Sequence, residues 1–231
     1  MRAIFVAGTD TGVGKTVVCG LVAKYFKEKG FNVVTQKWFQ TGSCFPTDIN
    51  THLNIIGKNI NLFKKYFKYM CPYILKFPSS PHLAAKLEGK KILINKIKKS
   101  FNYLLNEFDF VIVEGTGGIL VPYSSKRLII DIVEEFNIPT IIVVANKLGA
   151  INHTLLTVEA LDKKNIKIIG IIFNNLMKNQ NKIILEDNVR IIKKISGQNI
   201  LGVLHYKRNV KLLYKDFLHI GEKLSKIIKD E

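Results

Sequence analysis

Short apolar runs alternate along the chain with longer segments of helical periodicity. Runs rich in Val and Ile that end at Gly, Pro, Asn or Asp are typical of strands, whereas apolar residues spaced three and four apart predict helices. The predicted strands are Ala3–Ala7, Asn32–Gln36, Phe108–Val113, Pro139–Ala145, Ile166–Phe173 and Asn199–Leu204. The predicted helices are Lys15–Lys29, Leu83–Glu88, Ile92–Glu107, Leu128–Phe136, Ile151–Lys164, Lys182–Ser196 and Val210–Lys229.

This alternation predicts an α/β fold with one doubly wound, mostly parallel sheet and helices on both of its faces. The stretches 111–113 and 141–144 contain no polar residue, as expected for central strands buried on both sides. A chain of 231 residues fits a single domain over residues 1–231. Thr41–Ser80 sustains no period, and we expect it to be a long loop of the kind that often carries ligand contacts.

Composition and the lengths of the apolar runs limit the cellular compartments in which we expect the protein. The first apolar run, Ala3–Ala7, is too short for a signal-peptide core, and no run approaches the roughly 18 residues that span a bilayer. Cys19, Cys44 and Cys71 are widely spaced and form no Cys-x-x-Cys pair. We therefore expect a cytoplasmic protein in a reducing compartment, with no membrane partner.

A net charge of +17 raises the question of a nucleic-acid partner. The lysines are scattered through nearly every predicted helix, which favours solvated helix faces and no nucleic-acid partner. The best candidate patch is Lys64–Tyr69, where basic and aromatic residues interleave as stacking on single-stranded RNA would require. A helix that packs its aromatic side chains inward explains this patch equally well, so both interpretations stay open.

The first predicted strand runs into a glycine-rich loop and then directly into a helix. The loop Gly8–Thr16 reads GTDTGVGKT. Its glycines let successive N–H groups point at phosphate oxygens, and the helix N-terminus adds positive potential. Lys15 is then placed to contact the β- and γ-phosphates, and Thr16 to ligate Mg²⁺. The first glycine lies one residue earlier than usual, but the Gly-Lys-Thr core is intact, so we predict a P-loop.

Two further strand ends carry candidate chemistry. Glu114 follows the buried strand Phe108–Val113, so its carboxylate lies at the same sheet edge as Thr16, and two such oxygens suit Mg²⁺. Lys37 follows the second strand, where a fixed cation lowers the barrier to a phosphoryl transfer that brings negative charges together. A surface lysine and a capping acid are the ordinary alternatives for these two residues.

Five elements in order resemble the dethiobiotin synthetases. Gly8–Thr16 is similar to the phosphate loop of that family. The other matching elements are Lys37–Gly42, Pro72-Tyr73 with Ser80–Ala85, Val113–Gly118, and Lys147–Gly149 with Ile151–Thr154.

The resemblance implies a P-loop ligase that uses ATP and Mg²⁺. In the implied reaction one amine of 7,8-diaminononanoate attacks CO₂ (from bicarbonate) to give a carbamate. The carbamate oxygen takes the γ-phosphoryl group of ATP, and the second amine closes the ring with loss of phosphate to give dethiobiotin. The resemblance also implies a homodimer whose substrate site lies at the subunit interface.

Candidate residues follow from these motifs, some by their position and some by the resemblance. Asp48 as a metal ligand, Asn152 at the substrate carboxylate and Asn174 at the adenine edge rest on the resemblance. The candidate catalytic residues are Lys15 and Lys37. The candidate metal ligands are Thr16, Asp48 and Glu114. The candidate substrate contacts are Thr11, Thr41, Gly117 and Asn152. The candidate ATP contacts are Gly12, Val13, Gly14, Lys15, Thr16, Val17, Asp48, Glu114, Gly115, Thr116, Gly117, Asn174 and Asn175.

The chain departs from the family pattern at three places: Gly12, where an acid is frequent, Trp38, where proline is usual, and His205, where proline ends the last strand. Asn174 and Asn175 both remain candidates for reading the base. The main alternative is a ParA/MinD-like nucleotide switch, which is disfavoured because Asp10 replaces its signature lysine. An amidoligase of the cobyrinate type shares the loop, but we expect no room for its glutaminase domain after Asn199–Leu204.

Overall fold

A computed structural model describes residues 1–229 and contains a six-stranded parallel sheet. The strand order is β2-β5-β1-β6-β7-β8, and all neighbouring pairs are parallel. This arrangement confirms the predicted α/β fold with a doubly wound parallel sheet. The strands are β1 (Ala3–Gly8), β2 (Val33–Lys37), β5 (Phe110–Gly118), β6 (Thr140–Ala145), β7 (Ile168–Asn174) and β8 (Ile200–Leu204).

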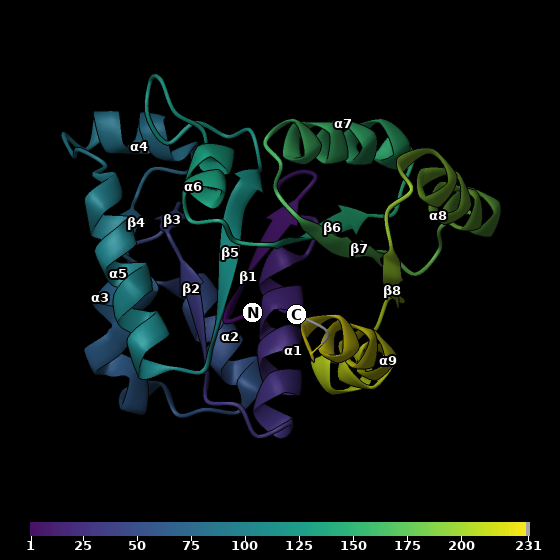
Figure 1. The fold of residues 1–231 in the computed structure, drawn as a ribbon, viewed down its shortest axis with the longest axis horizontal. Helices are drawn as coiled ribbons and strands as arrows, with labels where there is room; N and C mark the ends of the chain where they lie inside the picture. The colour runs from purple at the N-terminus through teal and green to yellow at the C-terminus, as the bar shows by residue number, and fades with distance from the viewer. Residues whose placement is uncertain (230–231) are drawn as a thin grey trace.

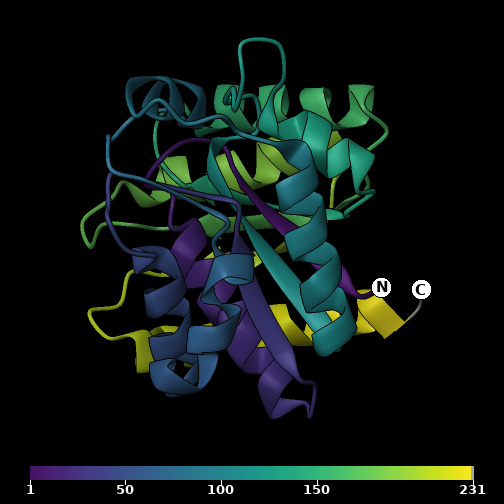
Figure 2. The same cartoon turned by 90° about the vertical axis from the view of Figure 1, so that its left-hand side faces the viewer.

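Helices cover both faces of the sheet (Figure 1). In Figures 1 and 2 α7 and α9 lie on opposite sides of β6, β7 and β8. On the face of α9, apolar side chains of α1 and α9 pack on the strands to form one core; α5, α6, α7 and α8 help to form the other. The bounds are α1 (Lys15–Glu28), α5 (Ile94–Glu107), α6 (Ile129–Glu135), α7 (Ala150–Lys163), α8 (Lys182–Ser196) and α9 (Val210–Lys229).

The expectation of a long loop over Thr41–Ser80 is wrong. The segment contains short helices and one strand of a second, two-stranded parallel sheet, whose other strand ends at Thr41. Helix α2 escaped prediction although Ile49, Leu53 and Ile56 recur at helical spacing and are buried. The elements of this region are β3 (Phe39–Thr41), α2 (Thr47–Ile56), the 3₁₀ helix η1 (Ile60–Tyr66), α3 (Phe67–Met70), β4 (Tyr73–Leu75) and α4 (Pro81–Leu87).

In the structure, the aromatic side chains of the basic and aromatic patch Lys64–Tyr69 point inward, as the packing interpretation expects. Tyr66, Phe67 and Tyr69 pack against the core. Lys65 and Lys68 lie over the rings of Tyr66 and Tyr69, 4.6 and 4.9 Å from the ring centroids. Because these rings are held by the core and their neighbouring lysines, they are not free platforms on which bases would stack.

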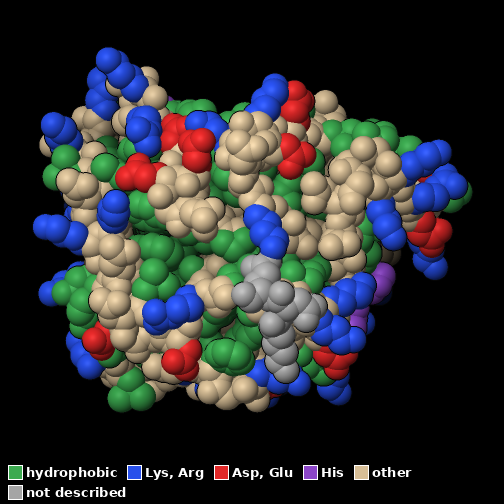
Figure 3. All heavy atoms as spheres, viewed as in Figure 1, with side chains coloured by type: hydrophobic (Ala, Val, Ile, Leu, Met, Phe, Trp, Pro, Cys, Tyr) green, Lys and Arg blue, Asp and Glu red, His purple; other side chains and the backbone are tan. Residues whose placement is uncertain are grey.

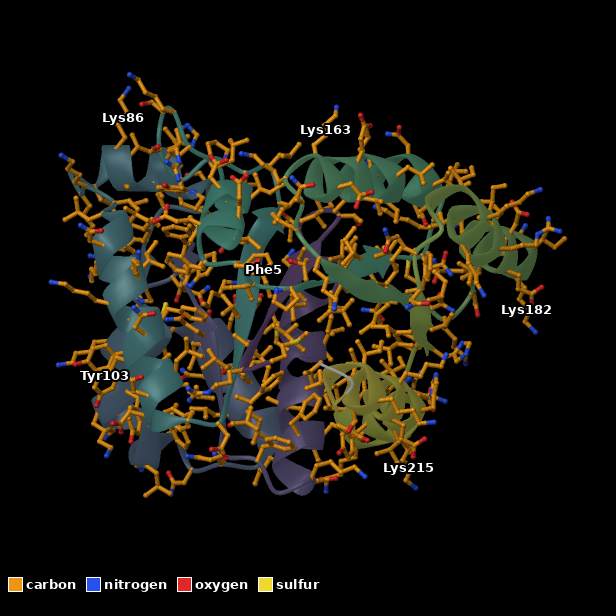
Figure 4. The ribbon with its side chains drawn as sticks, in the orientation of Figure 1. Phe5, Lys86, Tyr103, Lys163, Lys182 and Lys215 are labelled. Carbon is orange, nitrogen blue, oxygen red and sulfur yellow. The ribbon has the colours of Figure 1, made fainter. Side chains whose placement is uncertain are left out.

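Lysine and arginine side chains are spread over the surface. Figure 3 shows them scattered across one face among apolar and neutral atoms. Figure 4 shows Lys86, Lys163, Lys182 and Lys215 pointing outward from four different helices, whereas Phe5 lies inside. Among the described residues, no helix is long and apolar enough to cross a membrane.

Candidate active site

The P-loop connects the centre of the sheet to α1. Strand β1 ends at Gly8 and α1 begins at Lys15, so the loop lies at the carboxyl edge of the sheet, where ligands bind in folds of this kind. Gly14 has a φ of 97°, and a Cβ there would collide with the side-chain amide of Asn174. The Nζ of Lys15 donates to the carbonyl oxygen of Asp10 at 2.7 Å. The loop thus has the curled backbone that phosphate binding requires.

Lys37 and Glu114 meet because their strands are in register. They are paired positions on the parallel neighbours β2 and β5, and Lys37 Nζ lies 2.7 Å from Glu114 Oε1. Lys37 also forms an ion pair with Asp48, which α2 supplies. The Thr16 hydroxyl, from the first turn of α1, donates to Glu114 Oε1 at 2.9 Å. Two carboxylates, a lysine and a hydroxyl therefore converge at one point.

Burial and charge set the protonation states in this cluster. Burial alone would lower the pKa of Lys37, but Glu114 and Asp48 outweigh it and raise that pKa above its usual value. Burial alone would raise the pKa of Glu114, but Lys37 and His52 hold it at about 2. For Lys15, burial lowers the pKa to about 8. Lys37 and Glu114 are thus both charged at neutral pH.

The same cluster suits a divalent cation. Thr16, Asp48 and Glu114 supply oxygen atoms only, which is the donor type that Mg²⁺ takes. Glu114 is 1% exposed, and its Oε2 is a buried oxygen without a hydrogen-bond partner. This Oε2 lies 2.9 Å from His52 Nε2, whereas Oε1 accepts hydrogen bonds from Thr16 and Lys37, so Oε1 is the oxygen on the side of the oxygen-donor cluster. The residues present therefore fit a magnesium ion.

A cleft of about 740 Å³ opens between the P-loop, β3, the segment before α4 and the end of β5. This volume is within the usual range for a small-molecule site. The predicted residues that line it are Thr11, Gly12, Gly14, Lys15, Thr16, Val17, Lys37, Thr41, Glu114, Thr116 and Gly117. Most of the candidate residues for phosphate, substrate and catalysis are thus brought together.

Three other predicted residues lie near this cleft but do not line it. Val13 is buried under the loop, and Asp48 reaches the cluster through Lys37. Gly115 is buried where a Cβ would lie 2.9 Å from the Phe5 ring, so only glycine fits that position without a shift. Glu114 and Gly115 lie within β5, which continues to Gly118; the prediction that this strand ends at Val113 is wrong.

Asn174 and Asn175 have different surroundings. The Asn174 side-chain Nδ2 donates to the carbonyl oxygen of Val13 at 3.0 Å and so ties β7 to the P-loop. Asn175 accepts a hydrogen bond from Asn146 at 3.0 Å, and its Nδ2 lies 3.5 Å from His205 Nδ1. Asn175 and His205 line a second cavity of about 550 Å³ between α8 and the end of β8.

Asn152 is not part of either cavity. It is exposed near the start of α7, in a region where Leu148 is 83% exposed and Leu156 is 53% exposed. In this single chain Asn152 therefore makes no contribution to the cleft that holds Lys37.

Sequence reasoning missed several residues of the site. Gln40 lines the cleft and accepts a hydrogen bond from the Asp48 backbone at 3.1 Å; Ser79 and Ser80 line it as well. His52, fully buried beside Glu114, was also missed. Its spacing of four residues from Asp48 would have placed both on one helix face, had α2 been recognised.

Trp38 does not disturb the neighbouring Lys37. Its ring is buried 5.3 Å from the Phe5 ring, centroid to centroid, and its Nε1 donates to Gln36 Oε1 at 2.9 Å. The usual proline is thus replaced by a residue that fills the core beneath the site.

Solved structures with the same fold include cell-division and plasmid-partition proteins. MinD in the MinC:MinD complex of Aquifex aeolicus aligns with a TM-score of 0.63 at 13% identity, covering 98% of this chain and 96% of that one. A plasmid partition protein of Borrelia burgdorferi bound to AMPPNP aligns with a TM-score of 0.62 at 15% identity, covering 99% and 98%. At such identities the likeness establishes the fold alone.

Sequence comparison is more specific. A family model described as an AAA domain matches residues 2–211. The ATP-dependent dethiobiotin synthetase BioD of Clostridium perfringens is 39% identical, covering 88% of this chain and 90% of that protein. The corresponding protein of Methanococcus vannielii is 37% identical, covering 89% and 94%, and BioD 2 of Haemophilus influenzae is 41% identical, covering 75% and 91%. The chain therefore belongs to the ATP-dependent dethiobiotin synthetase family.

Proposed function

We propose that this chain is a dethiobiotin synthetase that uses Mg-ATP, CO₂ and 7,8-diaminononanoate. The observation that carries the proposal is the convergence of Lys15, Thr16, Lys37, Asp48 and Glu114 at one cleft. Such a site needs no covalent enzyme intermediate, since it accelerates a reaction by positioning reactants and neutralising charge.

Each group has a defined task in this reaction. The loop amides and Lys15 hold the β- and γ-phosphates. Because the loop also lines the cleft, phosphates bound there lie beside the other groups of the site. Lys37 stabilises the charge that builds up as the carbamate oxygen takes the γ-phosphoryl group. Thr11, Thr41 and Gly117 line the part of the cleft where the diamine would lie.

Thr16, Asp48 and Glu114 would hold Mg²⁺. When bound, the ion neutralises charge on the phosphate oxygens. The chain's own contribution is to hold the two carboxylates close together, which Lys37 does by pairing with both.

The second cavity is suited to the nucleobase. Asn175 lines this cavity, and its Nδ2 makes only the long 3.5 Å contact with His205, whereas Asn174 does not line it and donates its Nδ2 to the P-loop carbonyl of Val13. We therefore assign base reading to Asn175 and a loop-positioning role to Asn174. His205 occupies the position of the usual proline and lies beside Asn175.

A homodimer would complete the substrate site. Asn152 is close to the α7 N-terminus, where unpaired N–H groups favour an anionic carboxylate. The exposed Leu148 and Leu156 nearby give an apolar surface that a second copy would cover. We propose that Asn152 of each subunit binds the carboxylate of substrate held in the other. A cytoplasmic location is in keeping with the three free cysteines.

A direct test incubates purified protein with Mg-ATP, bicarbonate and 7,8-diaminononanoate. Mass spectrometry detects dethiobiotin, and phosphate release is measured in parallel, with each component omitted in turn. We expect product only when all are present. Folded protein that hydrolyses ATP without product, or that binds DNA or lipid in a nucleotide-dependent way, would instead indicate the switch ATPase suggested by its structural neighbours.

A further inference from the structure

His52 is a buried histidine that lies directly beside the Glu114 carboxylate. It lies on α2, its side chain is 0% exposed, and its Nε2 is 2.9 Å from Glu114 Oε2. The two atoms are close but not aligned as a good hydrogen bond, and among the described residues neither ring nitrogen has another hydrogen-bond partner. Within the described chain, Glu114 is the acid that lies within ion-pair distance of this ring.

The two oxygens of Glu114 have separate environments. Oε1 receives the Thr16 hydroxyl and the Lys37 ammonium, on the side of the proposed metal. Oε2 points the other way, toward His52, in a pocket that Cys19 also borders: ligand atoms of Cys19, His52 and Glu114 all lie within 4.8 Å of one another. Without His52, Oε2 would be left facing a protonated thiol and apolar side chains.

A buried carboxylate oxygen without a partner costs free energy, and a carboxylate held at one oxygen alone can rotate. Asp48 and His52 are four residues apart, so they project from one face of α2. Helix α2 therefore carries both Asp48, a candidate metal ligand, and His52, which contacts the candidate ligand Glu114. One helix thus supplies the Asp48 carboxylate and contacts the Glu114 carboxylate.

Building on the proposed magnesium site, we propose that His52 is a positioning residue that fixes the Glu114 carboxylate. In this role the ring proton is assigned to Nε2, whose 2.9 Å contact with Oε2 limits rotation of the carboxylate and keeps Oε1 directed at Thr16 and Lys37. Partners of metal-ligating carboxylates commonly act in this way, and their loss weakens metal affinity about 10- to 100-fold. His52 itself does not line the cleft.

The test is Mn²⁺ binding in the presence of the non-hydrolysable analogue AMPPCP, followed by the electron paramagnetic resonance signal of free Mn²⁺. His52→Leu keeps a side chain in the space but removes the donor, and we expect Mn²⁺ to bind about tenfold more weakly. His52→Gln carries an amide nitrogen the same number of bonds from Cα as Nε2, and we expect it to restore affinity to within about threefold of wild type.

A control variant and a second measurement distinguish this role from a general effect on packing. His219→Leu changes an exposed histidine on α9 and is expected to leave Mn²⁺ affinity unchanged. Steady-state kinetics supply a second readout, since the Mg²⁺ concentration for half-maximal rate should rise in His52→Leu while the KM for the diamine stays constant. Melting curves verify that each variant is folded.

The outcomes are distinct. Wild-type affinity in His52→Leu, or affinity in His52→Gln as weak as in His52→Leu, overturns the proposal, as does a wild-type protein that binds no Mn²⁺. Because binding is measured without turnover, a wild-type protein that binds Mn²⁺ but makes no dethiobiotin refutes the proposed reaction alone.

Discussion

Lys37 is the residue on which the electrostatics of the site depend. It is almost fully buried, and it pairs with both Asp48 and Glu114. Removing one partner of a buried charge cluster leaves the other uncompensated, and this costs more than the pair itself contributes. The same two carboxylates are the proposed metal ligands, so a cation and Lys37 share the task of compensating them.

Replacing Lys37 by Met should therefore have two effects. Turnover should fall by about 100-fold or more, as when one transition-state-stabilising donor is lost. Without Mg²⁺ the free energy of unfolding should fall by about 3 kcal/mol. Millimolar Mg²⁺ should recover part of that loss, because the unpaired carboxylates bind it.

Thermal melts with and without Mg²⁺ measure the stability effect, and Lys86→Met, at an exposed lysine of α4, is the matched control. Wild-type turnover in Lys37→Met would remove Lys37 from the mechanism. Equal destabilisation with and without Mg²⁺ would contradict the metal site.

The three cysteines should react very differently with thiol reagents. Cys44 is exposed, whereas Cys19 and Cys71 are buried, and burial raises the pKa of Cys71 to about 12. Because the thiolate is the reactive form, iodoacetamide should modify the native protein quickly at Cys44 only. Intact mass spectrometry should show one added group in the native state and three after denaturation; rapid modification at Cys19 or Cys71 would argue against the packing around them.

At the scale of elements, α9 is attached to α1 by a polar contact in an otherwise apolar interface. The Tyr214 hydroxyl donates to Glu28 Oε2 at 2.6 Å, and Lys24 lies 4.4 Å from the centroid of the Tyr214 ring. Phe217 and Leu224 are buried in the same interface. The helix is thus docked on α1 by this hydrogen bond together with buried apolar side chains.

Tyr214→Phe should lower the free energy of unfolding by about 1 kcal/mol at neutral pH. Burial first, and then the hydrogen bond to Glu28, raise the pKa of Tyr214. Since the folded-state pKa is the higher one, the tyrosine's contribution is complete below pH 10, its value in the unfolded chain, and is lost as pH rises further. Urea titrations at pH 7 and pH 10.5 should show a smaller difference at the higher pH; an unchanged or larger one would exclude this linkage. Tyr206→Phe, at an exposed tyrosine, is the control.

Elements differ in how far the sequence predicts them. The central strands were predictable because they are buried on both faces, so runs such as Val111–Val113 carry no polar residue. The region from β3 to β4 was not, because its strands have three residues each and the helical spacing of Ile49, Leu53 and Ile56 in α2 went unrecognised between irregular segments. The site follows the same division: Thr16 and Lys37 lie at the ends of predictable elements and Glu114 lies on a predictable strand, whereas His52 depends on α2.

At the scale of the whole molecule, the proposed dimer divides each site between two chains. Lys37 would come from one subunit and Asn152 from the other. Lys37→Met and Asn152→Leu variants, each impaired alone, should therefore complement one another when co-expressed, because a mixed dimer contains one site in which both residues are intact. Random pairing should restore about a quarter of wild-type activity.

The matched control combines Lys37→Met with Thr16→Ala. Both changes affect the same subunit's half of the site, so a mixed dimer has no intact site and no recovery is expected. Failure of the first pair to exceed the activity of its separate variants would contradict a shared site.

In the proposed reaction, this chain couples ATP cleavage to ring closure. The most direct measurement supplies ¹³C-bicarbonate, ATP, Mg²⁺ and 7,8-diaminononanoate and compares the ADP formed with the labelled dethiobiotin formed. We predict one ADP for each labelled product, and neither without the diamine. ADP that accumulates at the same rate without the diamine, with no labelled product, would contradict the account.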